Sequence, residues 1–345
     1  MKNNFKIFDR VIDKKSPTLI IAEIGINHMG NEDLCKEMIF SALDAGADCV
    51  KLQTVNEEES YLPNTESYKI FKGTHLNKSS LIRLSNFAKD NNGFIFSTPA
   101  DFSSLDLLNS IDVCAYKISS GLLTNFPLLD KMATYNKPII LSTGMAKEIE
   151  ISNAINILRK KNVKNIALLH CISLYPAPFR TLNLNFINKL SKKHRLISGY
   201  SDHSEGNLAC LAAVSIGAKI IEKHFTIDKS IIGADNKTSM EPKEFRDMCS
   251  KIRDIEDMLY KSDDKPHPLE LKFRNNRYRK VVAKRNIKKG EKITIENVNF
   301  MRGENNHNSS INAYDWDKIV GKICMKEIKK HSFITSDLLD DSVYV

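Results

Sequence analysis

The chain has 345 residues, of which 42% are apolar and 27% are charged, a composition typical of a globular protein with one large domain and a smaller one. Its 51 basic residues outnumber its 42 acidic residues and give a net charge of +9. The lysines are spread along the chain and do not alternate with aromatic residues. The charge therefore gives little support for a nucleic-acid partner, and it fits an anionic small substrate equally well.

The cysteines and the N-terminus indicate the compartment. The seven cysteines are scattered and form no CxxC pair or zinc-type spacing, so we expect apolar fillers in a reducing environment. The N-terminus lacks the apolar stretch of a secretory signal, and nowhere do about 18 uncharged apolar residues run together. We expect a soluble, cytoplasmic protein that has neither a membrane nor a nucleic acid as partner.

Short β-rich runs alternate with longer amphipathic stretches between residues 18 and 260, as successive βα units require. The AGAD and IGAK joints place glycine where a helix ends before a strand. Eight units within roughly 240 residues predict a (β/α)8 TIM barrel. A doubly wound sheet would normally carry a GxGxxG fingerprint after its first strand, which AEIGINHMG lacks. The predicted strands are 19–24, 48–54, 94–97, 114–118, 138–142, 165–170, 196–200 and 219–224.

The remaining segments complete the predicted domain organisation. Residues 1–260 form the barrel domain, within which the polar segment 56–78 is predicted to be a long loop after the second strand, placed to cover the barrel mouth. Residues 261–280, polar and interrupted by prolines, are predicted to be a linker. Residues 281–345 change to short strands and tight turns, with one predicted helix at 313–321. This small domain is near the lower size limit for independent folding.

Polar side chains recur where the predicted strands end. Two histidines, His203 and His224, each follow a β-branched run and lie one strand-helix-strand unit apart. In a parallel barrel such positions meet at one mouth, and catalytic residues come from the ends of several strands. Each histidine taken singly is as well explained as a packed or hydrogen-bonded structural residue. Earlier strands end in Glu23, Lys51, Gln53, Lys117 and Ser142.

These strand-end motifs, in this order, resemble the sialic acid synthase family of phosphoenolpyruvate-dependent nonulosonic acid synthases. The motifs are AEIGINHMG (22–30), VKLQT (50–54), STPAD (97–101), YKISSG (116–121), LSTGM (141–145), LLHCISLYP (168–176), YSDHS (200–204) and IEKHF (221–225). The tail, with NIKKGEKI and MRGENN, resembles the small antifreeze-like SAF domain, of the β-clip type, that follows the barrel in that family. The resemblance implies a TIM barrel followed by this domain.

The resemblance implies a role for each strand-end residue. His203 and His224 become ligands of a divalent metal, preferably Mn²⁺ and alternatively Mg²⁺ or Co²⁺. Lys51 and Lys117 grip the phosphate and carboxylate of phosphoenolpyruvate, and Glu23 handles protons. Three alternatives stay open: a lysine paired with Glu23 or with Glu222 as a buried salt bridge, Glu23 as a buried acid that orients Lys51, and a Schiff-base lysine of an aldolase.

The implied substrate-binding residues line both halves of the site. Arg302 corresponds to an arginine that one subunit inserts into the barrel mouth of another, which implies a domain-swapped homodimer; the alternative is an ordinary exposed arginine. Asp235 lies in GADN and is nearly as well explained by turn chemistry. Leu122 and Ser173 depart from the sialic acid type and leave the acceptor sugar open. The substrate-binding residues are Gln53, Thr98, Ser120, Ser142, Ser173, Tyr175, Ser201, Asp235, Tyr278 and Arg302.

The implied activity is that of a C–C bond-forming transferase of the N-acetylneuraminate synthase type. It condenses phosphoenolpyruvate with an N-acyl hexosamine, either N-acetylmannosamine or a 2,4-diacetamido-trideoxyhexose, and yields N-acetylneuraminate or a related sugar acid plus phosphate. A legionaminate or pseudaminate synthase shares this chemistry and is the first alternative. A lysine aldolase and a non-catalytic carbohydrate-binding or nucleic-acid-binding protein are the others.

Overall fold

The computed structural model describes residues 4–231, 235–259, 265–303 and 310–340. The chain divides into two compact units, Met1–Tyr260 and Lys261–Val345, and each is considered by itself. Within the described residues no helix is long and apolar enough to cross a membrane.

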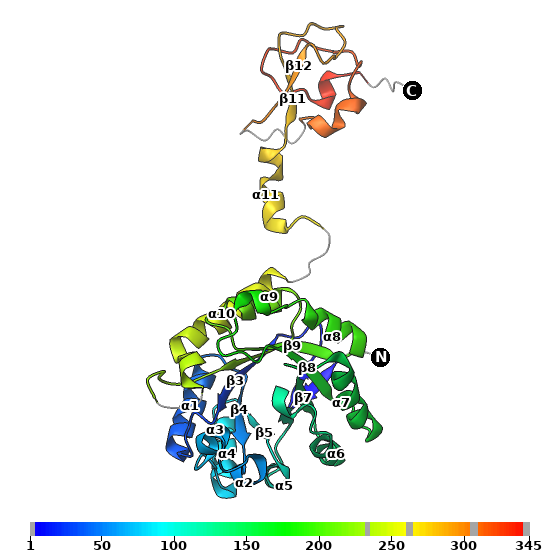
Figure 1. Ribbon diagram of the computed structural model, residues 1–345. Helices are drawn as coiled ribbons and strands as arrows, with labels where there is room; N and C mark the ends of the chain where they lie inside the picture. Colours follow the sequence, from blue (N-terminus) through cyan, green and yellow to red (C-terminus); the bar gives the residue numbers. More distant parts are fainter. Residues whose placement is uncertain (1–3, 232–234, 260–264, 304–309, 341–345) are drawn as a thin grey trace. The chain divides into compact units, whose positions relative to one another are not determined.

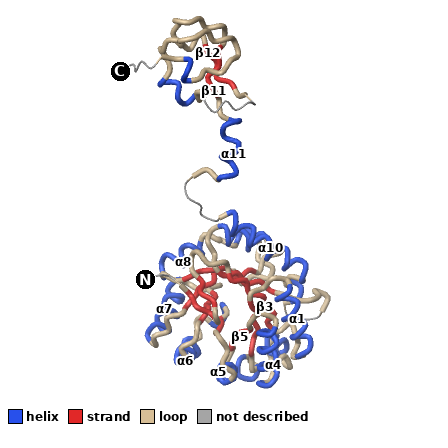
Figure 2. Tube along the Cα trace, turned by 180° about the vertical axis from the view of Figure 1, so that it is seen from behind, coloured by secondary structure: helices blue, strands red, loops and turns tan. Residues whose placement is uncertain are grey.

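The first unit is a closed barrel of parallel strands in the order β10-β3-β4-β5-β6-β7-β8-β9, with helices outside it (Figures 1 and 2). This confirms the predicted TIM barrel, and each predicted strand overlaps one observed strand. The strands are β3 (Leu19–Gly25), β4 (Cys49–Thr54), β5 (Ile95–Pro99), β6 (Tyr116–Ile118), β7 (Ile139–Ser142), β8 (Ile166–Cys171), β9 (Ile197–Asp202) and β10 (Ile220–His224).

The outer helices begin at polar capping residues. Asn31, Asn77, Asp101 and Asn125 each accept a hydrogen bond from a backbone N–H of the first turn, which satisfies a donor that the helix itself leaves free. The helices are α1 (Glu32–Asp44), α4 (Lys78–Asp90), α5 (Phe102–Ser110), α6 (Phe126–Thr134), α7 (Glu148–Lys160), α8 (Phe186–His194), α9 (Leu208–Ser215) and α10 (Pro242–Met258), with short 3-10 turns at Ser120–Leu122, Phe179–Thr181 and Asn236–Thr238.

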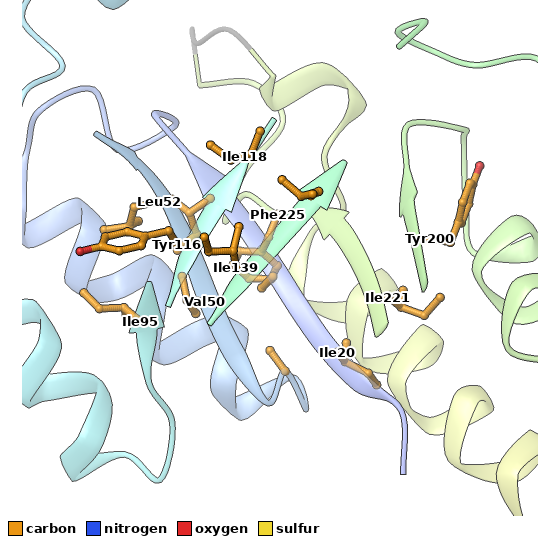
Figure 3. Packing of buried hydrophobic residues seen from close by; sticks show 14 of the residues in the cluster. Ile20, Val50, Leu52, Ile95, Tyr116, Ile118, Ile139, Tyr200, Ile221 and Phe225 are labelled. Atoms are coloured by element: carbon orange, nitrogen blue, oxygen red, sulfur yellow. The ribbon is translucent and has the colours of Figure 1, made fainter. Parts of the chain in front are cut away.

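Two apolar layers hold the barrel together. The outer layer lies between strands and helices, and Figure 3 shows part of it with Ile20, Val50 and Tyr116 labelled. The inner layer fills the amino-terminal end of the barrel. A hairpin of β1 (Phe5–Ile7) and β2 (Arg10–Ile12) packs against this inner layer. The sequence did not predict the hairpin, because strands of three residues are too short to show alternation.

Strands β9 and β10 approach each other closely at one glycine. A Cβ atom on Gly199 would lie 2.1 Å from the backbone oxygen of Ile220, far inside the contact distance of the two atoms. Only glycine leaves room for this approach, so Gly199 sets the spacing of the two strands that carry His203 and His224.

The prediction for residues 56–78 was wrong in one respect. The segment contains two short helices, α2 (Glu57–Ser60) and α3 (Glu66–Phe71), where a loop without its own elements was expected. Asn56 and Thr65 cap them through their side chains. Asp101 holds the start of the segment, because its carboxylate accepts hydrogen bonds from Asn56 N at 2.8 Å and Ser60 Oγ at 2.9 Å. Helices this short depend on such tertiary contacts, so periodicity could not reveal them.

The second unit has a small apolar core of its own. Strands β11 (Lys280–Ala283) and β12 (Val298–Met301) pair antiparallel, and 3-10 turns cover Ala313–Lys318 and Ser336–Leu338. The predicted helix at 313–321 is therefore a 3-10 turn. Residues 261–280, predicted to be a linker, contain the helix α11 (Pro268–Arg277). Pro268 at its first turn suits a helix start, where a missing N–H costs nothing.

Candidate active site

The inward face of the barrel changes character along every strand. On β3 the buried apolar Leu19 and Ile21 are followed by Glu23, and on β4 Cys49 is followed by Lys51. Side chains two residues apart share one face of a strand, so these residues lie in successive layers of one lumen. The apolar layer is at the amino-terminal end, and the polar layer is at the carboxyl-terminal end, where active sites of this fold lie.

Two lysines and two glutamates form a buried ion-pair cluster in the polar layer. Lys51 Nζ lies 3.1 Å from Glu23 Oε2 and 3.3 Å from Glu222 Oε2, and Lys117 Nζ lies 3.5 Å from Glu222 Oε1. All four side chains are at most 5% exposed. The salt-bridge alternative for the lysines thus describes a real contact. The contacts that both lysines make with Glu222 also show that the two ammonium groups converge, as binding of one anion by both lysines requires.

The cluster separates the pKa values of its carboxyl groups. Burial raises the pKa of Glu23 to about 7, against the opposing charge of Lys51. Burial acts in the same direction on Glu222, but Lys117 and Lys51 outweigh it and lower that pKa to about 2. Burial also lowers the pKa of Lys117 to about 8. Glu23 and Lys117 therefore both exchange protons close to neutral pH, as acid-base groups of an active site do.

Hydroxyl groups follow β7 and its neighbours. Lys117 Nζ donates to Ser142 Oγ at 2.7 Å, and Ser120 Oγ accepts from Gly144 N at 3.0 Å. Ser173 approaches the same glycine, since a Cβ on Gly144 would lie 2.5 Å from Ser173 Oγ. The structure thus places one predicted serine on Lys117 and brings two more together at Gly144, two residues after Ser142. On β5, Thr98 is buried, and its Oγ1 has no hydrogen-bond partner in the structure.

The two imidazoles lie side by side on the same rim. The ring centroids of His203 and His224 are 5.3 Å apart, and the ring of Tyr175 packs 4.1 Å from that of His203. His203 Nδ1 is 2.9 Å from the carbonyl oxygen of Ile172. When Nδ1 of His203 carries the ring proton and donates it to this carbonyl oxygen, the lone pair of Nε2 is free to bind a metal ion. The predicted convergence of the two histidines is therefore what the geometry shows.

The remaining predicted barrel residues also line this rim. Gln53 Nε2 donates to Glu23 Oε1 at 2.9 Å and orients that carboxyl group. Ser201 Oγ donates to Glu222 Oε1 at 2.8 Å. Asp235 lies close to the imidazoles, with its Oδ2 atom 3.7 Å from His224 Nδ1. Gln53, Ser201 and Asp235 therefore belong to the same site, because each contacts one of its charged or imidazole side chains.

The donor set fits a divalent ion held by two imidazoles. Burial lowers the pKa of His224 to about 4, against the charge of Asp235, so its imidazole is neutral as a ligand must be. The contact of His203 Nδ1 with a backbone carbonyl is the one that metal-binding histidines commonly make. Within the described ranges no group of three or more His, Cys, Asp or Glu side chains is arranged to hold a metal. His203 and His224 would hold such an ion and would leave further positions for water and substrate.

Tyr278 and Arg302 belong to the second unit. Tyr278 follows α11, where its ring packs against Arg274 and Tyr314. Arg302 follows β12 and is exposed. Because each unit is described by itself, a place for either residue at a barrel mouth stays a prediction.

Sequence reasoning missed Glu222 and Cys171 as site residues. Glu222 bridges both lysines, and its signal was its position two residues before His224, on the same face of β10. Cys171 was interpreted as an apolar filler, but its Sγ atom lies 3.7 Å from His203 Nδ1. Alternation along β8 places it inward beyond Leu169.

Comparison with known proteins decides the family. Residues 38–264 match the model of the NeuB family, and residues 278–340 match the SAF domain. The chain belongs to the NeuB family. The NeuB match includes both imidazoles and both lysines of the site, whereas Glu23 precedes it. The SAF match covers β11, β12 and the core of the second unit, which confirms the predicted antifreeze-like domain.

Several relatives of this NeuB-family chain are named as synthases of acidic sugars. The N,N'-diacetyllegionaminic acid synthase of Campylobacter jejuni is 40% identical over 92% of this chain and 98% of its own length. The pseudaminic acid synthase of Helicobacter pylori is 31% identical over 95% of this chain and 99% of its own length. The crystal structure of an N-acetylneuraminic acid synthetase from Leptospira borgpetersenii matches with a TM-score of 0.74 and 35% identity, over 80% of this chain and 98% of that one.

Proposed function

We propose that this chain is a phosphoenolpyruvate-dependent nonulosonic acid synthase that joins phosphoenolpyruvate to an N-acyl hexosamine. The observation that carries the proposal is the meeting of two buried lysines, two imidazoles and a carboxyl group of raised pKa at one end of the barrel. The names of the relatives support the reaction class. Assay of a panel of N-acyl hexosamines identifies the acceptor sugar.

The lysine cluster is suited to an anion that carries both a carboxylate and a phosphate. Lys51 and Lys117 already converge on Glu222, and an incoming anion competes for the same ammonium groups. Ser142 offers a hydroxyl group to Lys117, and Thr98 on β5 carries a buried hydroxyl group that has no hydrogen-bond partner in the structure. A buried lysine is costly without a negative partner.

The reaction that we propose forms one carbon-carbon bond and exchanges the C2–O bond to phosphate for a C2–O bond to water. When bound to His203 and His224, a divalent ion, preferably Mn²⁺, supplies Lewis acidity for the open-chain aldehyde of the sugar. C3 of phosphoenolpyruvate attacks the aldehyde carbon, and Lys51 and Lys117 hold the carboxylate and phosphate beside the positive charge that develops at C2. The aldehyde oxygen takes up a proton and becomes a hydroxyl group. Water adds to C2 and gives up a proton to Glu23, and the tetrahedral intermediate loses phosphate with cleavage of the C2–O bond and loss of the second proton, which leaves a carbonyl group at C2.

We assign to Glu23 the role of receiving the proton of the water that adds to C2. Its carboxyl group is held by Gln53 on one oxygen and by Lys51 on the other. A general base works best when its pKa lies near the working pH, and the pKa of Glu23 is about 7. Asp235 and Tyr175, beside the imidazoles, are the residues that we assign to the sugar side of the cavity.

A lysine aldolase is the second candidate, and one observation favours it. An imine needs a neutral amine, and burial lowers the pKa of Lys117 to about 8. Borohydride treatment with the keto acid product separates the two functions. A covalent adduct on Lys117 supports the aldolase, whereas loss of activity with EDTA and its return with Mn²⁺ support the synthase.

The experiment that tests the synthase combines the purified protein with Mn²⁺, phosphoenolpyruvate and a panel of N-acyl hexosamines. Sugar-dependent release of phosphate and a product mass equal to the sugar plus a pyruvate unit are expected. His224→Ala should release no phosphate, while Asp130→Ala, at a surface pair with Lys161, is the matched control and should retain full activity. Phosphate release that does not depend on any sugar would contradict the proposed reaction.

We further propose that the active form is a domain-swapped homodimer in the cytoplasm. The family resemblance assigns Arg302 to the barrel mouth of the partner subunit, where a guanidinium would fix the sugar and help to exclude water. The seven cysteines are all free, which suits a reducing compartment.

A further inference from the structure

A second buried ion pair lies outside the barrel lumen, on the far side of the strands that carry the imidazoles. Lys223 Nζ is 2.7 Å from Asp202 Oδ2, and both side chains are at most 1% exposed. Lys223 and Asp202 are partners in the register of β10 and β9. We propose that this Asp202–Lys223 pair positions His203 and His224. The proposal rests on the proposed function only in taking the two imidazoles as ligands of a divalent ion.

Strand alternation places the pair behind the site. Ser201 and His203 face the lumen, where Ser201 bonds to Glu222, so the alternate residues Tyr200 and Asp202 face outward. Asp202 Oδ2 accepts from Cys210 Sγ of α9 at 3.3 Å, which shows that the carboxylate lies between the strands and the helices. Figure 3 labels Tyr200 and Ile221 in this outer layer. The pair therefore touches no position that a substrate in the lumen reaches.

The contacts of the pair enclose the residue that carries the first imidazole. Asp202 Oδ1 accepts from Ser204 N at 2.8 Å and from Tyr200 OH at 3.1 Å. Lys223 Nζ donates both to Asp202 and to the carbonyl oxygen of Ser204. One ammonium group thus holds the residue before His203 and the residue after it.

The same lysine fixes the second imidazole through the backbone. Lys223 directly precedes His224, so its anchoring to Asp202 and Ser204 ties the end of β10 to the turn after β9. The ring centroids of the two histidines are 5.3 Å apart, and this spacing depends on how these two strand ends are joined. A ligand pair that few other groups hold in place needs such outer support.

Stability alone does not explain the pair. Two charges lose their hydration on burial, and replacing a buried pair with apolar residues often leaves stability unchanged or improves it. If the pair serves only stability, a neutral replacement should leave Mn²⁺ affinity unchanged. If the pair positions the imidazoles, the same replacement should weaken Mn²⁺ binding.

The test uses Asp202→Asn/Lys223→Met, in which the asparagine Oδ1 can still accept from Ser204 N. Binding of Mn²⁺ alone, measured from the free ion by electron paramagnetic resonance, is compared with the melting temperature of each variant. We expect the double variant to melt within a few degrees of the parent protein and to bind Mn²⁺ about tenfold or more weakly. Leu84→Ala on α4, a buried site away from β9 and β10, is the matched control. It should lower the melting temperature and leave the affinity for Mn²⁺ unchanged.

Three outcomes count against the proposal or its basis. Equal Mn²⁺ affinity in the parent protein and in a folded double variant overturns the positioning role and leaves the proposed function intact. If the parent protein binds no Mn²⁺, the two-imidazole site itself is wrong, and the inference falls with it. If the double variant does not fold, Asp202→Asn/Lys223→Gln replaces it, a neutral pair that keeps a donor near the carbonyl oxygen of Ser204, and unchanged Mn²⁺ affinity in that variant overturns the proposal.

Discussion

At the scale of single residues, the same two lysines act on two glutamates with opposite results. Lys51 contacts both Glu23 and Glu222, whereas Lys117 contacts Glu222 alone. The doubly paired Glu222 stays ionised with a pKa of about 2, while the pKa of Glu23 rises to about 7. Two titratable groups whose surroundings push their pKa values apart can take different chemical roles. We assign orientation of the two lysine ammonium groups to Glu222 and proton transfer to Glu23.

The raised pKa of Glu23 predicts a pH dependence of stability. The unfolded chain loses this proton near the ordinary value of 4.5, and the folded protein loses it near 7. The folded state therefore binds more protons in this window, and its stability falls as the pH rises from 4.5 to 7. Glu23→Gln should remove up to about 3 kcal/mol of this fall. Urea unfolding of the parent protein and of Glu23→Gln at pH 5 and pH 8 measures this difference in the free energy of unfolding. Equal pH dependence in the two proteins would show that Glu23 titrates normally.

Much of the site at this scale could be predicted from sequence. Glu23, Lys51, Lys117, His203 and His224 all lie at predicted strand ends, and one barrel end collects them because the strands are parallel. The contacts between them could not be predicted. Whether Glu222 meets one lysine or two depends on the stagger of neighbouring strands, which a single sequence does not specify. The proximity of Cys171 to His203 depends on the same stagger.

At the scale of elements, the spacing of β9 and β10 decides where the two imidazoles stand. The backbone oxygen of Ile220 occupies the position that a side chain on Gly199 would need. Ser201 on β9 and Glu222 on β10 are paired partners further along the same two strands. A change at Gly199 therefore propagates toward the polar layer as well as into the core.

Gly199→Ala should destabilise the barrel by about 3 kcal/mol, because the backbone of β10 cannot yield as a flexible side chain would. Gly121→Ala is the matched control, since a Cβ there meets no atom within 4 Å. Denaturant unfolding of the two variants measures the difference. Equal stabilities would show that the two strands separate without cost, contrary to this account.

The elements differ in how far sequence could predict them. The barrel strands were predicted because each is a short β-branched run followed by a helical pattern. The β1–β2 hairpin, α2 and α3 were not, since each is too short for periodicity and depends on contacts with distant residues. The backbone N–H of Asn56, for example, donates to the Asp101 carboxylate, which lies in the β5–α5 turn. The local sequence around Asn56 does not predict that contact.

At the scale of the whole molecule, the proposed domain-swapped homodimer has Arg302 of one subunit complete the barrel site of the other. A mixed dimer tests this arrangement. One subunit carries Arg302→Ala and the other carries His224→Ala, and the two carry different affinity tags so that the mixed dimer can be isolated. With exchanged domains, one of its two sites has both an intact barrel and an intact arginine, and about half of the parent activity is expected.

The alternative arrangements give different results in that experiment. If Arg302 serves the barrel of its own chain, neither site of the mixed dimer is complete, and no activity is recovered. If the protein is a monomer, no mixed species can be isolated through both tags. Each homodimer must be inactive on its own, which is the control for both variants.

The most direct test of the central claim follows the bridging oxygen of phosphoenolpyruvate. In the proposed reaction the lysine pair and Glu23 direct water to C2, so phosphate leaves with the oxygen that joined it to carbon. With ¹⁸O in that bridging position, mass spectrometry should find the label in the released phosphate. Label that instead remains on the carbon product would mean cleavage between phosphorus and oxygen, and it would contradict the chemistry that we assign to this cluster.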